Sequence, residues 1–194
     1  MSLSSHSVAA VWRSECRDTP SNPRAKPSDY THSGYDRGHQ APAQDFAWDA
    51  DELSDSFSMA NMAPQRPGLN RQEWERLEET VRAWAWARGS VDIYVGPVLA
   101  DNDATIGKGK VDVPASFWKI VVDRKKDEAI GFMLPNRTVA KGPLDPYEVP
   151  IAEIEHATGL QIPLPASVDA STAPQAWPSD LSGWRSAHAR ACAS

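Results

Sequence analysis

The chain has 194 residues and a mass of 21.2 kDa, enough for one domain with a sizeable core. Hydrophobic residues make up 41% of it, which excludes a wholly disordered chain, and no run of about 18 apolar residues exists to form a transmembrane helix. The formal net charge of −6 argues against a protein that coats nucleic acid, since such proteins are basic overall.

The N-terminal third carries few patterned elements. Residues 1–34 are rich in Ser and Pro and are expected to form loops. The first residues lack the basic start and long apolar run of a signal peptide, so localisation stays open, including export of a longer native form. Residues 45–60 hold five acidic residues and no basic one, which predicts a solvated loop.

The clearest predicted helix runs from about Asn70 to Arg88. Asn70 is a favourable N-cap, and Glu73 stands three residues later, as in a capping box. Apolar residues then recur at helical spacing along one face, and Gly89 ends the helix. This face consists of Trp74, Leu77, Val81 and Trp84.

Three strands and a short helix follow. The strands are predicted at residues 91–99, 117–123 and 129–135, and the last two flank a charged hairpin at 124–128. Residues 150–159 predict a short helix. From about Pro165 the chain is rich in Ala, Ser and Pro, which predicts a loosely attached tail. Helix and strands without regular alternation favour an α+β fold.

The cysteines and histidines give no metal cluster. Cys16 and Cys192 either pair or remain free thiols, and two cysteines cannot form a four-cysteine zinc site. None of the five histidines forms an HExxH motif.

Two stretches contain residues that are suited to catalysis or metal binding. In the first, Asp36-Arg37-Gly38-His39, the glycine allows a tight turn that brings Arg37 and His39 together. An arginine fork suits a phosphate, and a histidine can take a proton near neutral pH. A lone histidine is more often a structural residue, so this motif by itself is only weak evidence for catalysis.

The second stretch runs from Ser58 into the predicted helix. Asn61 and Asn70 offer amide oxygens, which suit a hard cation such as Mg²⁺, although Asn70 could also be a plain N-cap. Glu78 and Arg82 share a helix face, an arrangement also found in ordinary surface ion pairs.

Taken together, these segments closely resemble one family. In order and spacing they match the DNA/RNA non-specific endonucleases, the ββα-metal or His-Me finger nucleases of the endonuclease G-like type, through DRGHQAP, SMANMAPQ and LNRQEWERLEE. The likeness continues through VGP at 95–97, VPASFWK at 113–119 and AEIEHATGL at 152–160. It implies a ββα-metal nuclease fold with a central mixed or antiparallel sheet and flanking helices.

The resemblance also implies roles for individual residues. His39 matches the general base that activates water, and Asn70 matches the single protein ligand of the Mg²⁺, for which Mn²⁺ is an alternative. Asn61 matches the motif asparagine near the active site, and Glu78 the helix glutamate beside the metal waters. Three basic residues are expected to bind the substrate phosphates: Arg37, Arg66 and Arg82.

The resemblance divides the chain into three parts. It covers residues 29–165 as the nuclease domain, with a C-terminal tail at 166–194. Residues 1–28 match poorly, so we expect a shortened N-terminus, with Arg13, Arg17 and Arg24 as alternatives for an upstream phosphate-facing arginine.

The implied function is a Mg²⁺-dependent, sugar-non-specific endonuclease that hydrolyses DNA and RNA to 5′-phosphate ends. The alternative is a catalytically impaired nucleic-acid-binding or decoy domain of the same fold. The sequence indicates no membrane partner. Three biological roles stay open: scavenging, an organellar role, or a toxin. An inhibitor or immunity protein is a possible partner.

The net charge is compatible with this function. Five of the acidic residues lie in residues 45–60, whereas the motif-bearing segments are slightly positive. A nuclease needs a local phosphate site and must release its product, so a basic surface overall is not required.

Overall fold

The computed structural model describes residues 25–47, 49–100, 103–139, 141–173 and 175–192. Its helices and antiparallel strands confirm the predicted α+β class. Within these residues, no helix is both long and apolar enough to cross a membrane. Residues 1–24 of the poorly matched segment 1–28, with its three candidate arginines and Cys16, lie outside the described part of the chain.

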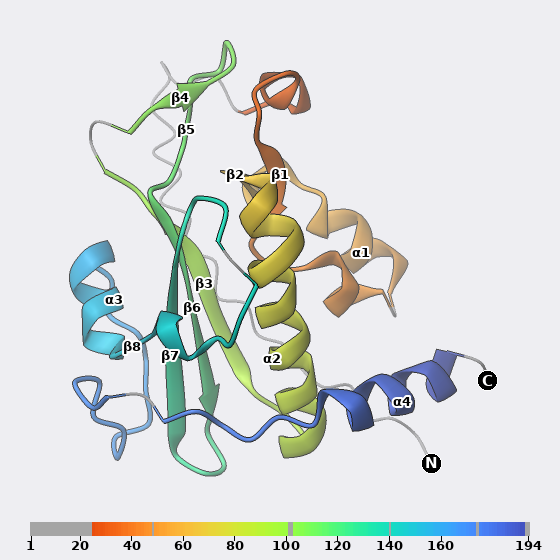
Figure 1. The fold of residues 1–194 in the computed structure, drawn as a ribbon, viewed down its shortest axis with the longest axis vertical. Helices are drawn as coiled ribbons and strands as arrows, with labels where there is room; N and C mark the ends of the chain where they lie inside the picture. The colour runs from red at the N-terminus through yellow and green to blue at the C-terminus, as the bar shows by residue number, and fades with distance from the viewer. Residues whose placement is uncertain (1–24, 48, 101–102, 140, 174, 193–194) are drawn as a thin grey trace.

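A two-stranded ribbon carries the first motif. Strands β1 (Asp36–His39) and β2 (Met62–Gln65) pair antiparallel, with Asp36 opposite Gln65 and His39 opposite Met62. The chain then enters the long helix, which completes a strand–strand–helix order (Figure 1).

The long helix begins earlier than its sequence predicts. A π-helical turn spans Leu69–Trp74 and continues directly into α2 (Glu75–Arg88). Gly68 is therefore the N-cap, and Asn70 lies inside the first turn, so the expected N-cap at Asn70 is wrong. The capping box is wrong as well, since Glu73 is buried and accepts a hydrogen bond from the Gly142 N–H at 3.1 Å.

The main sheet is entirely antiparallel and confirms the three predicted strands. Its strand order is β3-β6-β7-β8, with the charged hairpin joining β6 to β7. These strands span Asp92–Val98, Ser116–Asp123, Glu128–Pro135 and Glu148–Val149. A small separate ribbon pairs β4 (Thr105–Ile106) with β5 (Val111–Asp112).

Helices cover both faces of this sheet (Figure 1). The predicted apolar face of α2 is confirmed, because Trp74, Leu77, Val81 and Trp84 are all buried against one sheet face. On the other face, α3 (Ile151–Thr158) buries Ile154 among alternate residues of the same strands. Strand alternation thus supplies two apolar layers from one sheet.

The acidic segment is not a loop. Ala43–Phe46 forms a 3₁₀ turn, and α1 (Ala50–Ser56) follows it. The carboxylate of Asp49 caps α1 by accepting from the N–H groups of Asp51 and Glu52, both acidic residues of the first turn. Acidic side chains at a helix N-terminus favour the helix, which is why this segment folds while its side chains remain largely exposed.

The C-terminal segment packs on the core rather than hanging loosely. Trp177 is 8% exposed, and its ring lies 5.3 Å from that of Trp84 at 65°. Its carbonyl accepts from the Trp84 indole N–H, and the Arg88 guanidinium stacks 3.7 Å from its ring centroid. Helix α4 (Leu181–Cys192) then lies against α2 (Figure 1).

We predict that Trp177→Ala lowers the free energy of unfolding by about 3–5 kcal/mol, the usual cost of removing a buried tryptophan. Urea denaturation measures it. Trp86→Ala is the matched control, since Trp86 is 49% exposed and should cost well under half as much. Equal losses for the two variants would show that residues 175–192 do not contribute to the core.

Candidate active site

The ribbon presents Arg37 and His39 on one face. Side chains alternate along a strand, so residues two apart point the same way. The expected tight turn at Gly38 is wrong, because Gly38 lies within β1 opposite Ala63. A glycine is required at this position for another reason, because a Cβ atom on residue 38 would come within 2.2 Å of the fully buried Gln65 side chain.

Asn61 fixes the chain immediately after His39. Its Nδ2 donates to the carbonyls of Ala41 and Ser56, each at 2.8 Å, and its Oδ1 accepts from the Ala41 N–H at 2.9 Å. The Asn61 carbonyl also accepts from the Gln40 N–H. Asn61 is 8% exposed, and its side-chain amide is fully hydrogen-bonded to the protein. It therefore acts as a clamp that holds the chain at Ala41 against Ser56.

His39 is partly buried and held edge-on by an aromatic ring. The rings of His39 and Phe57 meet at 84° with centroids 5.1 Å apart. Burial, and secondarily the positive charge of Arg37, lower the pKa of His39. Its Nε2 is buried without a hydrogen-bond partner among the described residues. The lowered pKa favours the neutral form of a ring whose Nε2 is left without a protein partner in the described part of the chain.

Asn70 is tied to the ribbon through Asp36. Its Nδ2 donates to Asp36 Oδ2 at 3.0 Å, and Arg71 binds the same carboxylate in a bidentate pair at 2.8 and 2.6 Å. Although burial opposes it, these hydrogen bonds from Arg71 and Asn70 lower the pKa of Asp36. Since the amide nitrogen is used by Asp36, the amide oxygen is the atom left to bind a cation.

A group of charges lies further along α2. Arg82 Nη1 donates to Asp45 Oδ1 at 3.1 Å, so its partner comes from the acidic segment and not from its own helix. Burial raises the pKa of Glu78 to about 7, opposed by the charges of Lys119 and Arg82. Lys119 is 1% exposed in the central strand β6, and its ammonium lies 4.7 Å from the Trp74 ring centroid.

Sequence reasoning missed three residues of this site. Arg71 carries no motif signal beyond its place after Asn70. Lys119 lies within a segment quoted for the resemblance, and its position between apolar residues of a strand was the available signal for burial. Asp45 was assigned to the expected solvated loop, yet its carboxylate is 6% exposed in the ion pair with Arg82.

Arg66 lies apart from His39. It follows β2 at the end where Gln65 faces Asp36, whereas His39 is at the other end of the ribbon. Its exposed guanidinium stacks 4.1 Å from the Tyr35 ring centroid. A substrate-binding role for Arg66 stays a prediction.

The donor set fits a cation that keeps most of its water. No group of three or more His, Cys, Asp or Glu side chains able to hold a metal exists in the part of the chain that the structure describes. A single amide oxygen, oriented by a hydrogen bond to an ionised carboxylate, is consistent with Mg²⁺, which prefers oxygen and dehydrates reluctantly.

A ribbon that bears a histidine, followed by a helix whose first turn holds an asparagine against that ribbon, defines the ββα-metal class of nuclease folds. The sequence model of the DNA/RNA non-specific endonucleases matches residues 4–168. The chain belongs to this family.

Individual relatives agree with this assignment. The chain is 34% identical over 158 residues to "Nuclease 1, mitochondrial" of Schizosaccharomyces pombe, covering 72% of this chain and 49% of the relative. It is 35% identical over 151 residues to human "Endonuclease G, mitochondrial", covering 71% and 51%. The chain thus spans about half the length of these curated relatives.

A solved structure shows the same fold. The crystal structure of an EndoG/EndoGI complex, which concerns the mechanism of EndoG inhibition, superposes with a TM-score of 0.67 at 31% identity. The match covers 71% of this chain and 62% of the other.

The environment of His39 predicts an altered titration. Because burial and Arg37 disfavour the imidazolium, its pKa measured by NMR should fall below 6.5. Arg37→Gln should raise the pKa only part of the way, since burial remains. The same change at Arg190, exposed on α4, should leave it unaltered. A His39 pKa at or above 6.5 in the unmodified protein would contradict this environment.

The two motif asparagines should respond differently to truncation. Asn61→Ala removes three buried hydrogen bonds and leaves the Ala41 and Ser56 groups unpaired, so we expect a loss of about 2–4 kcal/mol in unfolding free energy. Asn70→Ala removes one partly buried hydrogen bond and should cost at most about 1.5 kcal/mol. Urea denaturation compares the pair, and equal losses would show that Asn61 is not the clamp.

Proposed function

We propose that this chain is a Mg²⁺-dependent, sugar-non-specific endonuclease that hydrolyses phosphodiester bonds of DNA and RNA. The observation that carries the proposal is the pairing of two features on one ribbon. A histidine with a lowered pKa stands on β1, and its buried Nε2 has no partner among the residues that the structure describes. The same strand contacts the amide of Asn70 through Asp36.

In this proposal His39 acts as the general base. A base must be unprotonated to accept a proton, and the lowered pKa keeps His39 neutral over a wider pH range than an ordinary histidine. Its Nε2 takes the proton of a water that attacks phosphorus. Phe57, on the edge of the ring, and the Asn61 clamp after β1 restrict the orientation of the base.

Asn70 would hold the Mg²⁺ through its amide oxygen, with Mn²⁺ as an alternative ion. When bound, such a cation stabilises negative charge on the phosphate and on the leaving oxygen. Asp36 and Arg71 orient the amide for this task, which is why their contacts matter although neither contacts the substrate in the proposal.

Two arginines would bind the scissile phosphate. Arg37 is exposed on the same strand face as His39, and Arg82 projects from α2 with its Nε buried and unpartnered among the described residues. Both would counter the charge that grows on the phosphate oxygens during attack. Glu78, whose pKa is near 7, would accept hydrogen bonds from waters beside the phosphate when ionised.

Recognition would rely on the backbone of the nucleic acid. Contacts to phosphate carry no sequence information directly, so a site built from arginines, an amide and a histidine gives little base preference. Family membership supports action on both DNA and RNA. The proposal includes products with 5′-phosphate ends. A protein inhibitor is a second proposed partner, supported by the EndoG/EndoGI complex of the structural relative.

Plasmid digestion tests the proposal. His39→Ala should slow cleavage by about 10²–10⁴-fold, the usual contribution of a general base, and EDTA should abolish cleavage by the unmodified protein. His156→Ala is the matched control, because His156 is exposed on α3, on the far face of the main sheet, and should cut at the unmodified rate.

Three outcomes would overturn the proposal. Unchanged cleavage by His39→Ala would refute the base, and cleavage that resists EDTA would refute the metal. Binding of DNA with no cleavage at any Mg²⁺ or Mn²⁺ concentration would instead identify an impaired, binding-only domain.

A further inference from the structure

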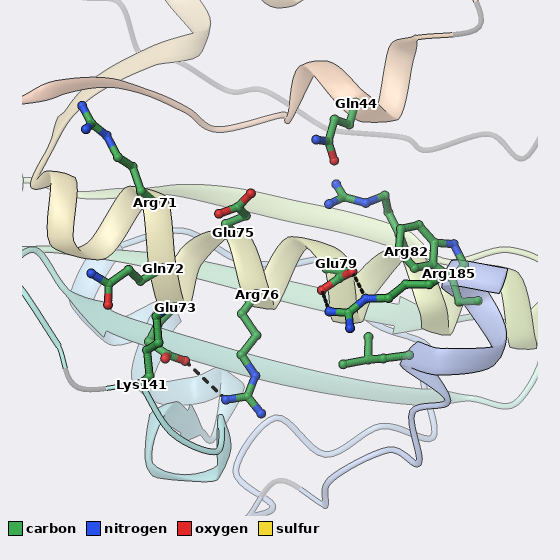
Figure 2. Close-up of a pocket in the computed structure, with 12 residues that line it drawn as sticks. Gln44, Arg71, Gln72, Glu73, Glu75, Arg76, Glu79, Arg82, Lys141 and Arg185 are labelled. Carbon is green, nitrogen blue, oxygen red and sulfur yellow. Dashed lines mark hydrogen bonds and ion pairs between the residues drawn. The ribbon is translucent and has the colours of Figure 1, made fainter. Parts of the chain in front are cut away.

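A charged groove lies between α2 and α4. Its volume is about 510 Å³, within the range of ligand-binding clefts. Helix α4 lies beyond residues 4–168, so the family match assigns no role to the wall that it forms. Side chains of the π-helical turn and of α2 line the groove, and Arg185 of α4 meets Glu79 there (Figure 2).

The groove is continuous with the proposed active site. Arg82, the proposed phosphate ligand, lines it, and Figure 2 shows its guanidinium near Gln44. Arg71, which binds the carboxylate that orients Asn70, lines it from the π-helical turn that precedes α2. A polynucleotide held at the reactive centre would therefore extend into the groove.

Basic side chains outnumber acidic ones in the lining of the groove, five to three. Two of the five, Arg71 and Arg82, are paired with Asp36 and Asp45, which do not line it. The basic set consists of Arg71, Arg76, Arg82, Lys141 and Arg185. Four of the five are arginines, whose planar fork matches a phosphate.

The contacts of Arg185 leave it able to exchange partners. Its guanidinium pairs with Glu79 through two hydrogen bonds of 2.5 Å (Figure 2). The Arg185 side chain is 61% exposed and that of Glu79 is 21% exposed. An exposed ion pair contributes little stability, so a phosphate can replace the carboxylate at small cost.

We propose that the groove between α2 and α4 is a subsite for the phosphate backbone of the substrate strand beside the scissile bond. Arg185 supplies one phosphate contact there, and Glu79 competes with the phosphate for it. This inference rests on the proposed function, because it takes the ligand to be a nucleic acid and Arg82 to mark the reactive centre.

The salt dependence of binding tests the subsite. Binding of a fluorescein-labelled 20-base-pair DNA duplex is measured by anisotropy over a range of KCl concentrations, with every variant in the His39→Ala background so that the DNA stays intact. Arg185→Ala should weaken binding, and the slope of log K against log salt should shrink by about 0.9, the value for one lost phosphate contact.

The Glu79→Gln variant separates this role from a structural one. If Glu79 competes with phosphate, its neutralisation frees Arg185 and tightens binding, the opposite of Arg185→Ala. If the pair only holds α4 in place, both variants break the same contact and weaken binding alike, which would overturn the proposal.

Two matched variants control for general charge effects. Arg190→Ala, in the last turn of α4, and Glu153→Gln, on α3, are exposed and do not line the groove. Each should shift affinity less than its counterpart in the groove. An Arg185→Ala slope equal to that of Arg190→Ala would also overturn the proposal.

The proposed function and this inference fail in different ways. If the unmodified protein cleaves DNA but the groove variants keep the original salt slope, only the subsite is refuted. If binding depends on Arg185 but the unmodified protein does not cleave, only the nuclease proposal is refuted. Absence of any binding to the duplex would refute both.

Discussion

The hydrogen bond from Asn70 to Asp36 is the contact on which the site depends. It joins the β1–β2 ribbon to the first turn of the long helix, two elements that meet only through tertiary folding. Arg71 hydrogen-bonds the same carboxylate and favours the orientation in which Asp36 meets the amide. Because His39 is on the strand that begins with Asp36, this link helps to set the position of the Asn70 amide relative to His39, the proposed base.

Burial favours the uncharged form of both His39 and Glu78. It lowers the pKa of His39 and raises that of Glu78 to about 7. Lys119, fully enclosed by the central strand and the Trp74 ring, favours the ionised form of Glu78. The main sheet therefore contributes electrostatically to the site as well as supporting α2.

Periodic patterns in the sequence predicted most of the fold. The buried face of α2 and the three long strands follow directly from apolar spacing, and the motif order predicted the ββα arrangement. Local composition is misleading in two places. The acidic segment has the composition of a solvated loop, yet Asp49 caps a helix there. The long helix begins with Leu69, which is fully buried, and so starts ahead of Asn70. Contacts between residues far apart in the chain, such as Asp36 with Arg71, Arg82 with Asp45, and Trp177 with Trp84, depend on the packed fold and leave no periodic trace.

We propose that Asp36 positions the Asn70 amide to bind a divalent cation. Paramagnetic broadening of the NMR signals of ¹⁵N-labelled protein during titration with Mn²⁺ tests this role. The side-chain amide signals of Asn70 should broaden at the lowest Mn²⁺ concentrations, and Asp36→Ala should shift this broadening to higher concentrations. Broadening that begins at the acidic helix α1 and leaves the Asn70 side chain unaffected would contradict it.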